Sequence, residues 1–334
     1  MARGLVASLL LAGAAALVVP QPPTGSKAPP PVFAPEGFVA PEPRPLTVTG
    51  DWSTTIVSSL ALLLRLGAGI TVHGWQPKLS LAAPQAGAYA LKLGPLYISD
   101  DSASLRGELK RPKGHLTLYE FDSSPFCRKV RDALTALDLE VDCRPCPGAV
   151  AGFSDELFER TGRRTVPYLV DADAGIELFE SEAIVDYLYD AYGPGREKTP
   201  FFLRGNVALV SAGLAGTVRL LPAAALQVDA RLDNIGRQPL SLYGYETSPF
   251  VRPVREKLCS LALPHTVVNA ARGSVKREEL IGRTGKPFQV PYLVDPNTGV
   301  ELFESVAIRI YLDRVYTTSG YTPLEDAPPQ VKTE

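Results

Sequence analysis

The sequence predicts an α/β protein built from two tandem copies of one β-α-β-α-β-β-α unit. An internal repeat is the main observation: residues 116–127 (LTLYEFDSSPFC) return as residues 240–251 (LSLYGYETSPFV), an offset of 124 residues. The segments TVPYLV at 165–170 and ELFES at 177–181 return, nearly unchanged, at the same offset. Such a repeat is longer than a solenoid unit of about 20–50 residues, and the 334 residues of the chain suffice for about two domains. Duplication of a whole domain follows.

The first strand and helix of the unit follow from local signals. Strand-forming residues alternate over 116–121, which predicts the first strand. Ser124 is a preferred N-cap and Pro125 a preferred first helical residue. A helix is expected next, with Leu134 and Leu137 on its apolar face. Its charged residues are expected mostly off that face: Arg128, Lys129, Arg131 and Asp132.

The remaining elements of the first copy follow in the same way. They are a strand at 140–144, a short helix at 154–161, a hairpin of strands at 167–171 and 176–179, and a final helix from its N-cap Ser181 to about Tyr192. The first two strands need a crossover helix and therefore pair in parallel, whereas the last two are antiparallel. The second copy repeats this order. Duplication also predicts that the halves pack about a pseudo-two-fold axis, as in a homodimer.

Charge and cysteine content exclude several classes of function. With 34 basic and 36 acidic residues, the net charge of −2 gives no broad attraction to nucleic acid or to an anionic membrane. The four cysteines are too few for a disulfide scaffold. The three histidines are scattered along the chain, and no metal site is expected.

The N-terminal region has the pattern of a targeting segment. A short cationic start and an apolar stretch up to Val19 are typical of a signal peptide. The following stretch, 20–45, is rich in proline and predicts a linker or transit segment without a core. Together they resemble the bipartite presequences of algae with secondary plastids, which implies plastid import, with secretion as the second choice. A further apolar stretch at 56–72 contains Arg65, and a helix packed on its own domain is favoured over a membrane span.

These patterns divide the chain into six segments. They are the presequence and linker (1–45), a helical or irregular lead-in (46–115), the first domain (116–195), a connecting helical segment (196–239), the second domain (240–318) and a C-terminal tail (319–334). Apolar stretches in the lead-in and in the connecting segment suggest that an apolar helical segment precedes each domain.

Three motifs give the unit a family resemblance. Ser-Pro-Phe at the first helix, Val-Pro before the third strand and Glu-Ser at the last helix occur in both copies. This combination resembles the thioredoxin-like N-terminal domain of glutathione transferases. It is also similar to glutaredoxins and to plastid and bacterial proteins with two such domains in tandem. The resemblance covers 116–193 and 240–316.

The resemblance implies a glutathione site in each copy. Val166-Pro167 and Val290-Pro291 match the family's cis-proline, where the residue before proline pairs with the cysteinyl backbone of glutathione. Glu180-Ser181 and Glu304-Ser305 match the motif that holds the γ-glutamyl end. From the residues alone, each proline could simply start a strand and each serine could simply cap a helix.

The active-site turn carries serine in place of the cysteine of glutaredoxins. Ser124 and Ser248 resemble the serine of serine-type transferases, whose hydroxyl donates a hydrogen bond to the glutathione sulfur and favours the thiolate. The alternative is that both serines only cap their helices.

Cys127 occupies the resolving position of a Cys-x-x-Cys turn, which is that of the second cysteine, and the first cysteine is absent. In a first helical turn its pKa could be lowered, which would allow glutathionylation, or it could be a small packed side chain. Cys143 and Cys146 could form a regulatory disulfide, although Pro145 and the strand geometry favour coincidence.

The sequence therefore predicts a glutathione-binding, transferase-like protein with glutathione as ligand or substrate and an unidentified electrophile or protein partner. Two alternatives stay open at this point. One is a plastid thiol-disulfide oxidoreductase that uses Cys127 with Cys143 or Cys146. The other is a non-catalytic binding or assembly module with vestigial sites.

Overall fold

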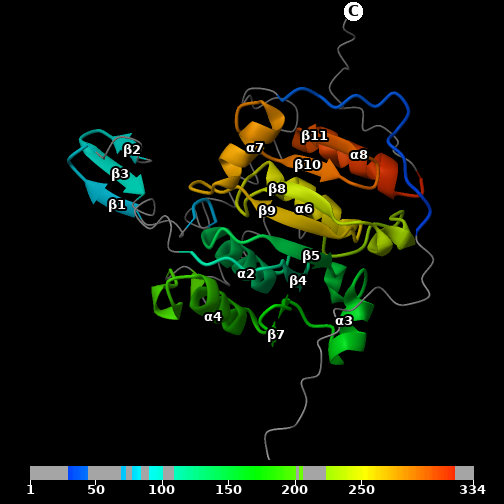
Figure 1. Cartoon of the computed structure of the whole chain (residues 1–334), viewed down its shortest axis with the longest axis horizontal. Coiled ribbons are helices and arrows are strands. Elements are labelled where there is room, and N and C mark those ends of the chain that lie inside the picture. Colours follow the sequence, from blue (N-terminus) through cyan, green and yellow to red (C-terminus); the bar gives the residue numbers. More distant parts are fainter. Residues whose placement is uncertain are drawn as a thin grey trace, which may run out of the picture.

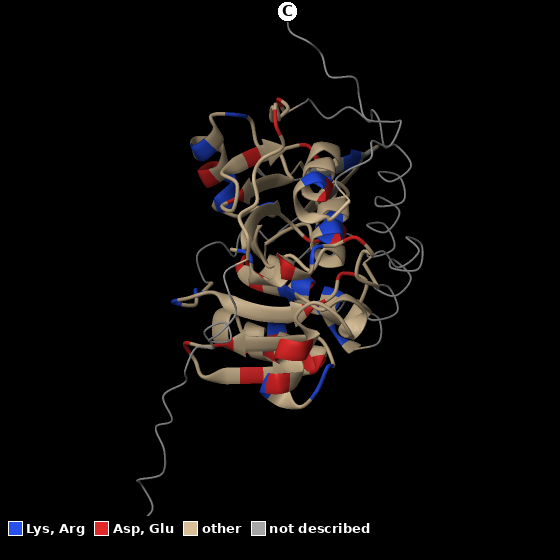
Figure 2. Cartoon of the chain, turned by 90° about the vertical axis from the view of Figure 1, so that its right-hand side faces the viewer, with Lys and Arg blue, Asp and Glu red and all other residues tan. Residues whose placement is uncertain are grey.

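The computed structural model describes residues 29–43, 69–72, 77–83, 90–100, 109–200, 203–205 and 223–319. The expected signal peptide and almost all of the two apolar segments lie outside the described residues. Among the helices that the structure describes, none is both long and apolar enough to cross a membrane. Basic and acidic residues are interspersed over both halves (Figure 2).

Both halves follow the predicted order of elements. The first half contains β4 (Leu116–Glu120), α2 (Pro125–Ala136), β5 (Val141–Pro145), α3 (Ser154–Thr161), β6 (Tyr168–Asp171), β7 (Ile176–Phe179) and α4 (Ser181–Tyr192). The second contains β8 (Leu240–Gly244), α6 (Val251–Ser260), β9 (His265–Asn269), α7 (Lys276–Thr284), β10 (Tyr292–Asp295), β11 (Val300–Phe303) and α8 (Ser305–Tyr316). Short 3-10 turns lie at 147–149, 196–198 and 232–236. The thioredoxin-like tandem fold is thereby confirmed.

One sheet of eight strands runs through both halves, in the order β11-β10-β8-β9-β5-β4-β6-β7 (Figure 1). Within each half the first two strands are parallel and the hairpin is antiparallel, as predicted. The halves join through an antiparallel ladder between β5 and β9, in which Asp142 faces Thr266. These two residues occupy equivalent repeat positions, since 266 − 142 = 124. A pseudo-two-fold axis therefore passes between them, which is the predicted pseudo-dimer.

Each half packs helices on both faces of its sheet. On one face, α2 and α4 cover an apolar core that includes Leu118 and Leu134, and α6 and α8 do the same in the second half. On the other face, α3 covers a smaller aromatic cluster with Tyr119 and Tyr168, and α7 covers its counterpart with Tyr292. The short helices α3 and α7 end at Gly162 and Gly285, both with φ near +70°. A residue with a Cβ would be strained there.

The lead-in differs from the prediction of a helical or irregular segment. It contains a three-stranded antiparallel sheet of β1 (Pro77–Ser80), β2 (Ala90–Leu93) and β3 (Leu96–Asp100), with β3 in the centre. This sheet stands apart from the eight-stranded one (Figure 1). Apolar and polar residues alternate on both sides of a turn at Gly94, which is a hairpin pattern that the sequence does contain.

The proline-rich stretch also differs from the expected linker without a core. Val32 is buried in the apolar core of the second half, and the ring of Phe38 lies 5.3 Å from that of Tyr311. Arg237 donates a hydrogen bond to the carbonyl of Pro30. Residues 29–43, here called the N-terminal strap, are thus part of the second half's packing. An extended proline-rich chain cannot form a core alone, but its apolar side chains can complete another one.

Candidate functional site

The two X-Pro bonds predicted to be cis, Val166-Pro167 and Val290-Pro291, are both cis in the structure. β6 begins at Tyr168 and β10 at Tyr292, so each valine lies just before the ladder that follows it. Both valines are partly exposed. Each half therefore presents a strand-like main-chain segment beside the sheet, which is the kind of backbone that pairs with an extended peptide.

The N-termini of α4 and α8 have an unusual backbone that is the same in both halves. Glu180 has φ 68° and ψ 115°, and Glu304 has φ 72° and ψ 111°. A non-glycine residue at positive φ is costly and is often kept where a ligand binds. The caps of these helices are Glu180 and Glu304, whereas Ser181 and Ser305 are the first helical residues. The prediction that the serines are the N-caps is off by one residue, because the strained glutamate already supplies the carbonyl that accepts the first helical bond.

The two glutamates differ in their surroundings. Glu180 is exposed, and within the described part of the chain its carboxylate has no partner. Glu304 is half-buried and accepts a hydrogen bond from the Gln289 side-chain amide at 3.0 Å. The carboxylate of the first half is therefore the more available of the two for a cationic group of a ligand.

Ser124 and Ser248 are bound within their own helices. Ser124 Oγ accepts a hydrogen bond from the backbone N–H of Cys127 at 3.3 Å, and Ser248 Oγ accepts one from Val251 N–H at 3.3 Å. The exposed fractions are 4% for Ser124 and 1% for Ser248. The capping alternative is thus present in the structure. A hydroxyl that accepts still has its proton to donate, so a bond to a ligand sulfur stays chemically open.

Cys127 does not have the lowered pKa that its place in the first helical turn suggests. The side chain is fully buried, and burial raises the pKa of its thiol to about 12, with the nearby Glu120 carboxylate as the next cause. The position of Cys127 in the helix is outweighed by the loss of water around it. A reactive thiolate at neutral pH is therefore not what the structure provides at this position, and packing is the role that it shows.

The other three cysteines are also free and buried. Cys143 and Cys146 form no disulfide, and burial raises the pKa of both thiols. The oxidoreductase alternative, which pairs Cys127 with one of them, would have to work with protonated and enclosed sulfurs.

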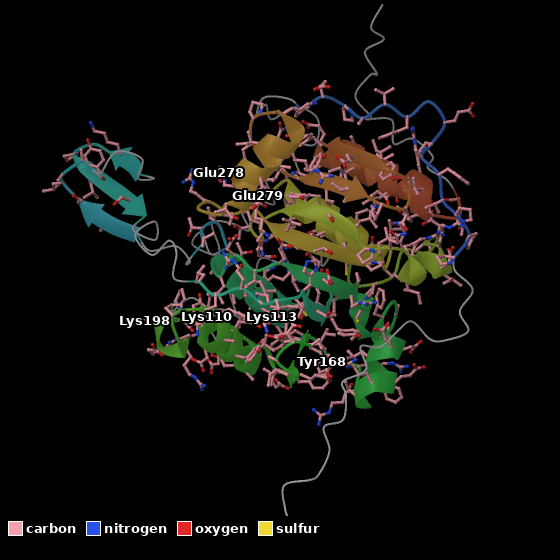
Figure 3. The ribbon with its side chains drawn as sticks, viewed as in Figure 1. Lys110, Lys113, Tyr168, Lys198, Glu278 and Glu279 are labelled. Carbon is pink, nitrogen blue, oxygen red and sulfur yellow. The ribbon has the colours of Figure 1, made fainter. Side chains whose placement is uncertain are left out.

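A tyrosine and carboxylate network anchors α4 and α8 to the hairpins. Tyr187 and Tyr192 donate hydrogen bonds to the carboxylate of Asp171 at the end of β6. Tyr311 and Tyr316 do the same to Asp295 at the end of β10. Tyr168, labelled in Figure 3, donates to Glu177 on the neighbouring strand. These bonds fix the two helices whose N-termini form the candidate sites.

A buried cluster of charges between the halves was not anticipated from the sequence. The charged residues of α2 that were expected off the apolar face are all buried. Three of the four equivalent positions on α6 are charged and buried as well, and the fourth holds Pro253. The buried charged residues are Arg128, Lys129, Arg131, Asp132, Arg252, Arg255 and Glu256. Two of these arginines bind across the axis. Arg131 Nε donates to Glu246 of the second half at 2.9 Å, and Arg255 donates to Asp122 of the first half at 2.7 Å.

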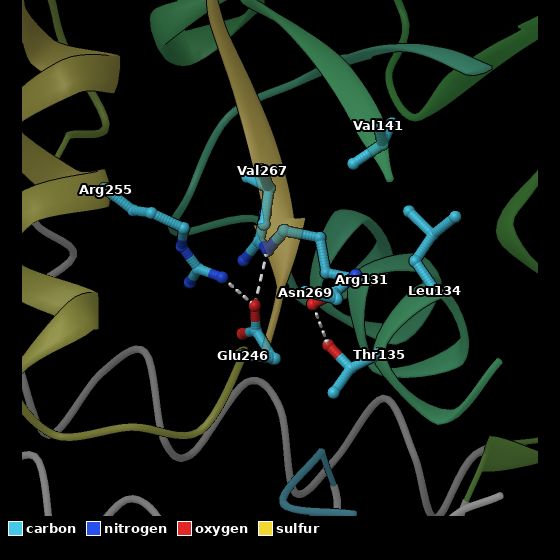
Figure 4. A pocket seen from close by; sticks show the side chains of 8 residues that line it. All are labelled: Arg131, Leu134, Thr135, Val141, Glu246, Arg255, Val267 and Asn269. Atoms are coloured by element: carbon cyan, nitrogen blue, oxygen red, sulfur yellow. Dashed lines mark hydrogen bonds and ion pairs between the residues drawn. The ribbon is translucent and has the colours of Figure 1, made fainter. Parts of the chain in front are cut away.

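The crossed pairs obey the pseudo-symmetry, because Arg131 and Arg255 are equivalent repeat positions, as are Asp122 and Glu246. Arg131, Arg255 and Glu246 line a small cavity together with Thr135 and Asn269, which hydrogen-bond to each other at 3.0 Å (Figure 4). One signal in the sequence could have revealed this cluster: arginine occurs at the same position of both copies, as Arg131 and Arg255. A residue that faces solvent is free to differ between two copies of a repeat. Helical periodicity placed them outside one core, and the second half covers them.

Known proteins support the family resemblance. The model of the glutathione S-transferase N-terminal domain matches residues 118–200 and again residues 242–320. A comparison with curated proteins gave no match.

Two solved structures illustrate the likeness. A Bombyx mori glutathione transferase in complex with GTT is 28% identical over 25% of this chain and 39% of its own length, with a TM-score of 0.22. A trimeric glutathione transferase of Leishmania is 18% identical over 64% of this chain and 70% of its own, with a TM-score of 0.23. This chain thus spans well under half of the Bombyx mori protein. From the two family matches and the two thioredoxin-like halves, the chain carries two glutathione S-transferase N-terminal domains in tandem.

Proposed function

We propose that this protein binds glutathione, with a site in each half and the first half as the more accessible one. One observation carries the proposal: a cis-proline segment and a strained glutamate at a helix N-terminus occur together in both halves. In the first half, the backbone of Val166 pairs with the cysteinyl residue of glutathione. The free N–H groups of α4 and the Ser181 hydroxyl bind the γ-glutamyl carboxylate, and the Glu180 carboxylate binds its α-ammonium group.

The proposed chemistry is a transferase step. The Ser124 hydroxyl, and Ser248 in the second half, donates a hydrogen bond to the glutathione sulfur and stabilises the thiolate. The thiolate then forms a bond to an electrophilic carbon, the bond from that carbon to its leaving group breaks, and the group departs to solvent with the electron pair; the proton released from the thiol also leaves to solvent. Residues 1–45 direct the protein to a plastid in the same proposal, which a fluorescent fusion of that segment would test.

Calorimetric titration of glutathione into the chain tests the binding. Ser181→Ala and Ser305→Ala should each weaken binding in one half, because losing a hydrogen bond to a charged group costs about 1.5–3 kcal/mol, roughly tenfold or more in affinity. Ser260→Ala, at the end of α6, is the matched control and should leave both sites unchanged. Absence of heat and of any thermal shift with millimolar glutathione would refute the proposal.

A second function has support from one observation. The near-complete burial of Ser124 and Ser248 favours a binding module without turnover. In that case Ser124→Ala leaves glutathione affinity unchanged and an electrophile screen gives no conjugate. Conjugation that falls on Ser124→Ala while affinity is retained would favour the enzyme.

A further inference from the structure

Three metal-ligating side chains meet at the seam between the halves, away from the candidate glutathione sites. They are Glu120 at the end of β4, Cys143 on β5 and His265 on β9, all of them buried. One ligand atom from each lies within 4.8 Å of the other two. Atoms bound to one zinc ion at about 2.0–2.3 Å lie roughly 3–4 Å from each other, so small side-chain rotations bring these three into range.

The ladder explains why these side chains meet. Cys143 and His265 are direct partners in the antiparallel β5–β9 pairing. Glu120 lies on β4, the other neighbour of β5, opposite Pro145, which follows Cys143 by two residues on the same face. Two ligands thus come from the first half and one from the second.

His265 is already oriented as a ligand. Its Nδ1 lies 2.9 Å from the carbonyl of Leu263, which fixes the proton on that nitrogen. The other nitrogen, Nε2, is buried and has no hydrogen-bond partner in the structure. A histidine held through one nitrogen by a backbone carbonyl, with the second nitrogen unused, is the usual arrangement of a metal ligand. His265 is 1% exposed, so bulk solvent does not reach the unused nitrogen.

We propose that Glu120, Cys143 and His265 bind a divalent ion of the zinc class and thereby link the two halves. A thiolate, an imidazole and a carboxylate form a donor set typical of zinc. Arg131 takes one carboxylate oxygen, Oε2, of Glu120, and a carboxylate has a second oxygen for a metal. On binding, the S–H bond of Cys143 breaks, an S–Zn bond forms and the proton leaves to solvent.

Supporting this, burial lowers the pKa of His265 to about 4, so the imidazole is neutral and ready to coordinate at physiological pH.

The pseudo-symmetry supplies variants that fit the fold. The mirror partners of Cys143 and His265 are Val267 and Val141, which face each other in the same ladder (Figure 4). Valine is therefore compatible with this seam, and Cys143→Val and His265→Val should fold. Cys127→Val is the matched control, because its equivalent in the second half is Val251 and Cys127 is not in the three-residue group.

The untagged chain, the three valine variants and Glu120→Gln are produced in medium containing Co²⁺ or Zn²⁺, gel-filtered, and analysed by elemental mass spectrometry and absorption spectroscopy. The parent chain and Cys127→Val should hold about one metal per chain, with a thiolate-to-cobalt charge-transfer band. Cys143→Val and His265→Val should each hold at least roughly tenfold less metal per chain, and both should lose the charge-transfer band. Glu120→Gln should weaken binding as well.

Three outcomes would overturn the proposal: a parent chain with no more metal than Cys143→Val, bound cobalt without the charge-transfer band, or equal loss in Cys127→Val. Should a valine variant fail to fold by circular dichroism, Cys143→Ser decides by the same spectrum. The readout does not involve glutathione, so this proposal and the proposed function fail independently.

Discussion

The first and second halves share their backbone but differ in how far each candidate site is engaged by the rest of the chain. Both have the cis X-Pro bond and the strained glutamate before the last helix. In the second half, however, Gln289 binds Glu304 and the N-terminal strap packs on α8 through Phe38. In the first half, Glu180 is exposed. The main-chain geometry of a ligand site is therefore present in both halves, whereas the glutamate side chain is exposed for a ligand in the first half.

The seam shows the same combination of symmetry and difference. The crossed pairs of Arg131 with Glu246 and of Arg255 with Asp122 obey the axis. By contrast, Arg128 lies within 3.4 Å of Glu246, whereas the three side-chain nitrogens of the equivalent Arg252 are buried without a hydrogen bond. A duplicated domain can thus keep the crossed ion pairs that join its two copies, while other residues of the same interface diverge.

Removing one shared carboxylate should produce the largest effect. Glu246→Gln leaves Arg131 and Arg255 buried without their anion, which should cost about 3–5 kcal/mol of unfolding free energy. Asp122→Asn at the mirror position should cost less, because only its contact with Arg255 is as short as 2.7 Å, while Arg131 and Arg128 lie at 3.5 and 3.8 Å. Guanidinium unfolding measures both values.

The control for this comparison is an exposed ion pair. Arg164 pairs with Asp155, whose side chain is 77% exposed, and Asp155→Asn should cost less than about 1 kcal/mol. An equal loss in Glu246→Gln and Asp155→Asn would mean that the seam does not depend on its charges.

The second prediction concerns the pH dependence of stability and His265, which pairs with Cys143 beside the axis where the mirror positions are both valine. Burial lowers the pKa of His265 to about 4 from its ordinary 6.5. The unfolded chain therefore takes up the proton first as the pH falls. The stability that comes from the neutral imidazole is fully present above about pH 6.5 and is lost progressively toward pH 4, by about 3 kcal/mol.

Urea unfolding between pH 7 and pH 4, with a chelator present, measures this loss. His265→Val carries the valine of the mirror position. Between pH 7 and pH 4 this variant should lose about 3 kcal/mol less unfolding free energy than the parent chain, because it lacks the imidazole that titrates. Identical pH profiles would show that His265 is not enclosed as the structure has it.

Much of this architecture could be predicted from the sequence. The parts that could not be predicted have one cause in common. The repeat, the Ser-Pro turn and the Val-Pro step depend on local chemistry, and so the order of elements, the cis bonds and the tandem fold were all predictable. The burial of Arg131 and Arg255 depends on what the other half covers. Helical periodicity assigns a residue to one core only, and it cannot show that a second half lies on the opposite face.

The third prediction tests the strap, which, among the residues that the structure describes, packs on the second half. Val32 is 7% exposed in the core of that half, and its neighbour Phe33 is 76% exposed. Val32→Ala removes two buried methyl groups' worth of apolar contact and should cost about 1.5 kcal/mol. Phe33→Ala should be nearly neutral in the same thermal unfolding experiment, although it deletes the larger side chain. A greater loss for Phe33→Ala would mean that the strap packs differently.

The smallest expected effect comes from exchanging one side chain between the candidate sites. Gln289 binds Glu304, and the first half has Thr165 at the equivalent position. Gln289→Thr frees the Glu304 carboxylate from one partner and should tighten glutathione binding in the second half by about two- to tenfold, the worth of one hydrogen bond. Measuring it in a Ser181→Ala background weakens the first site, so that the titration reports mainly the second half.

The reverse exchange, Thr165→Gln, should place an amide beside Glu180 and weaken the first half by a similar factor, measured with Ser305→Ala present. Opposite changes of this kind would assign the difference between the halves to the availability of the glutamate. If affinity stays the same in both exchanges, the difference must come from elsewhere, and the strap on α8 is then the feature to remove, because within the described part of the chain it packs on the second half.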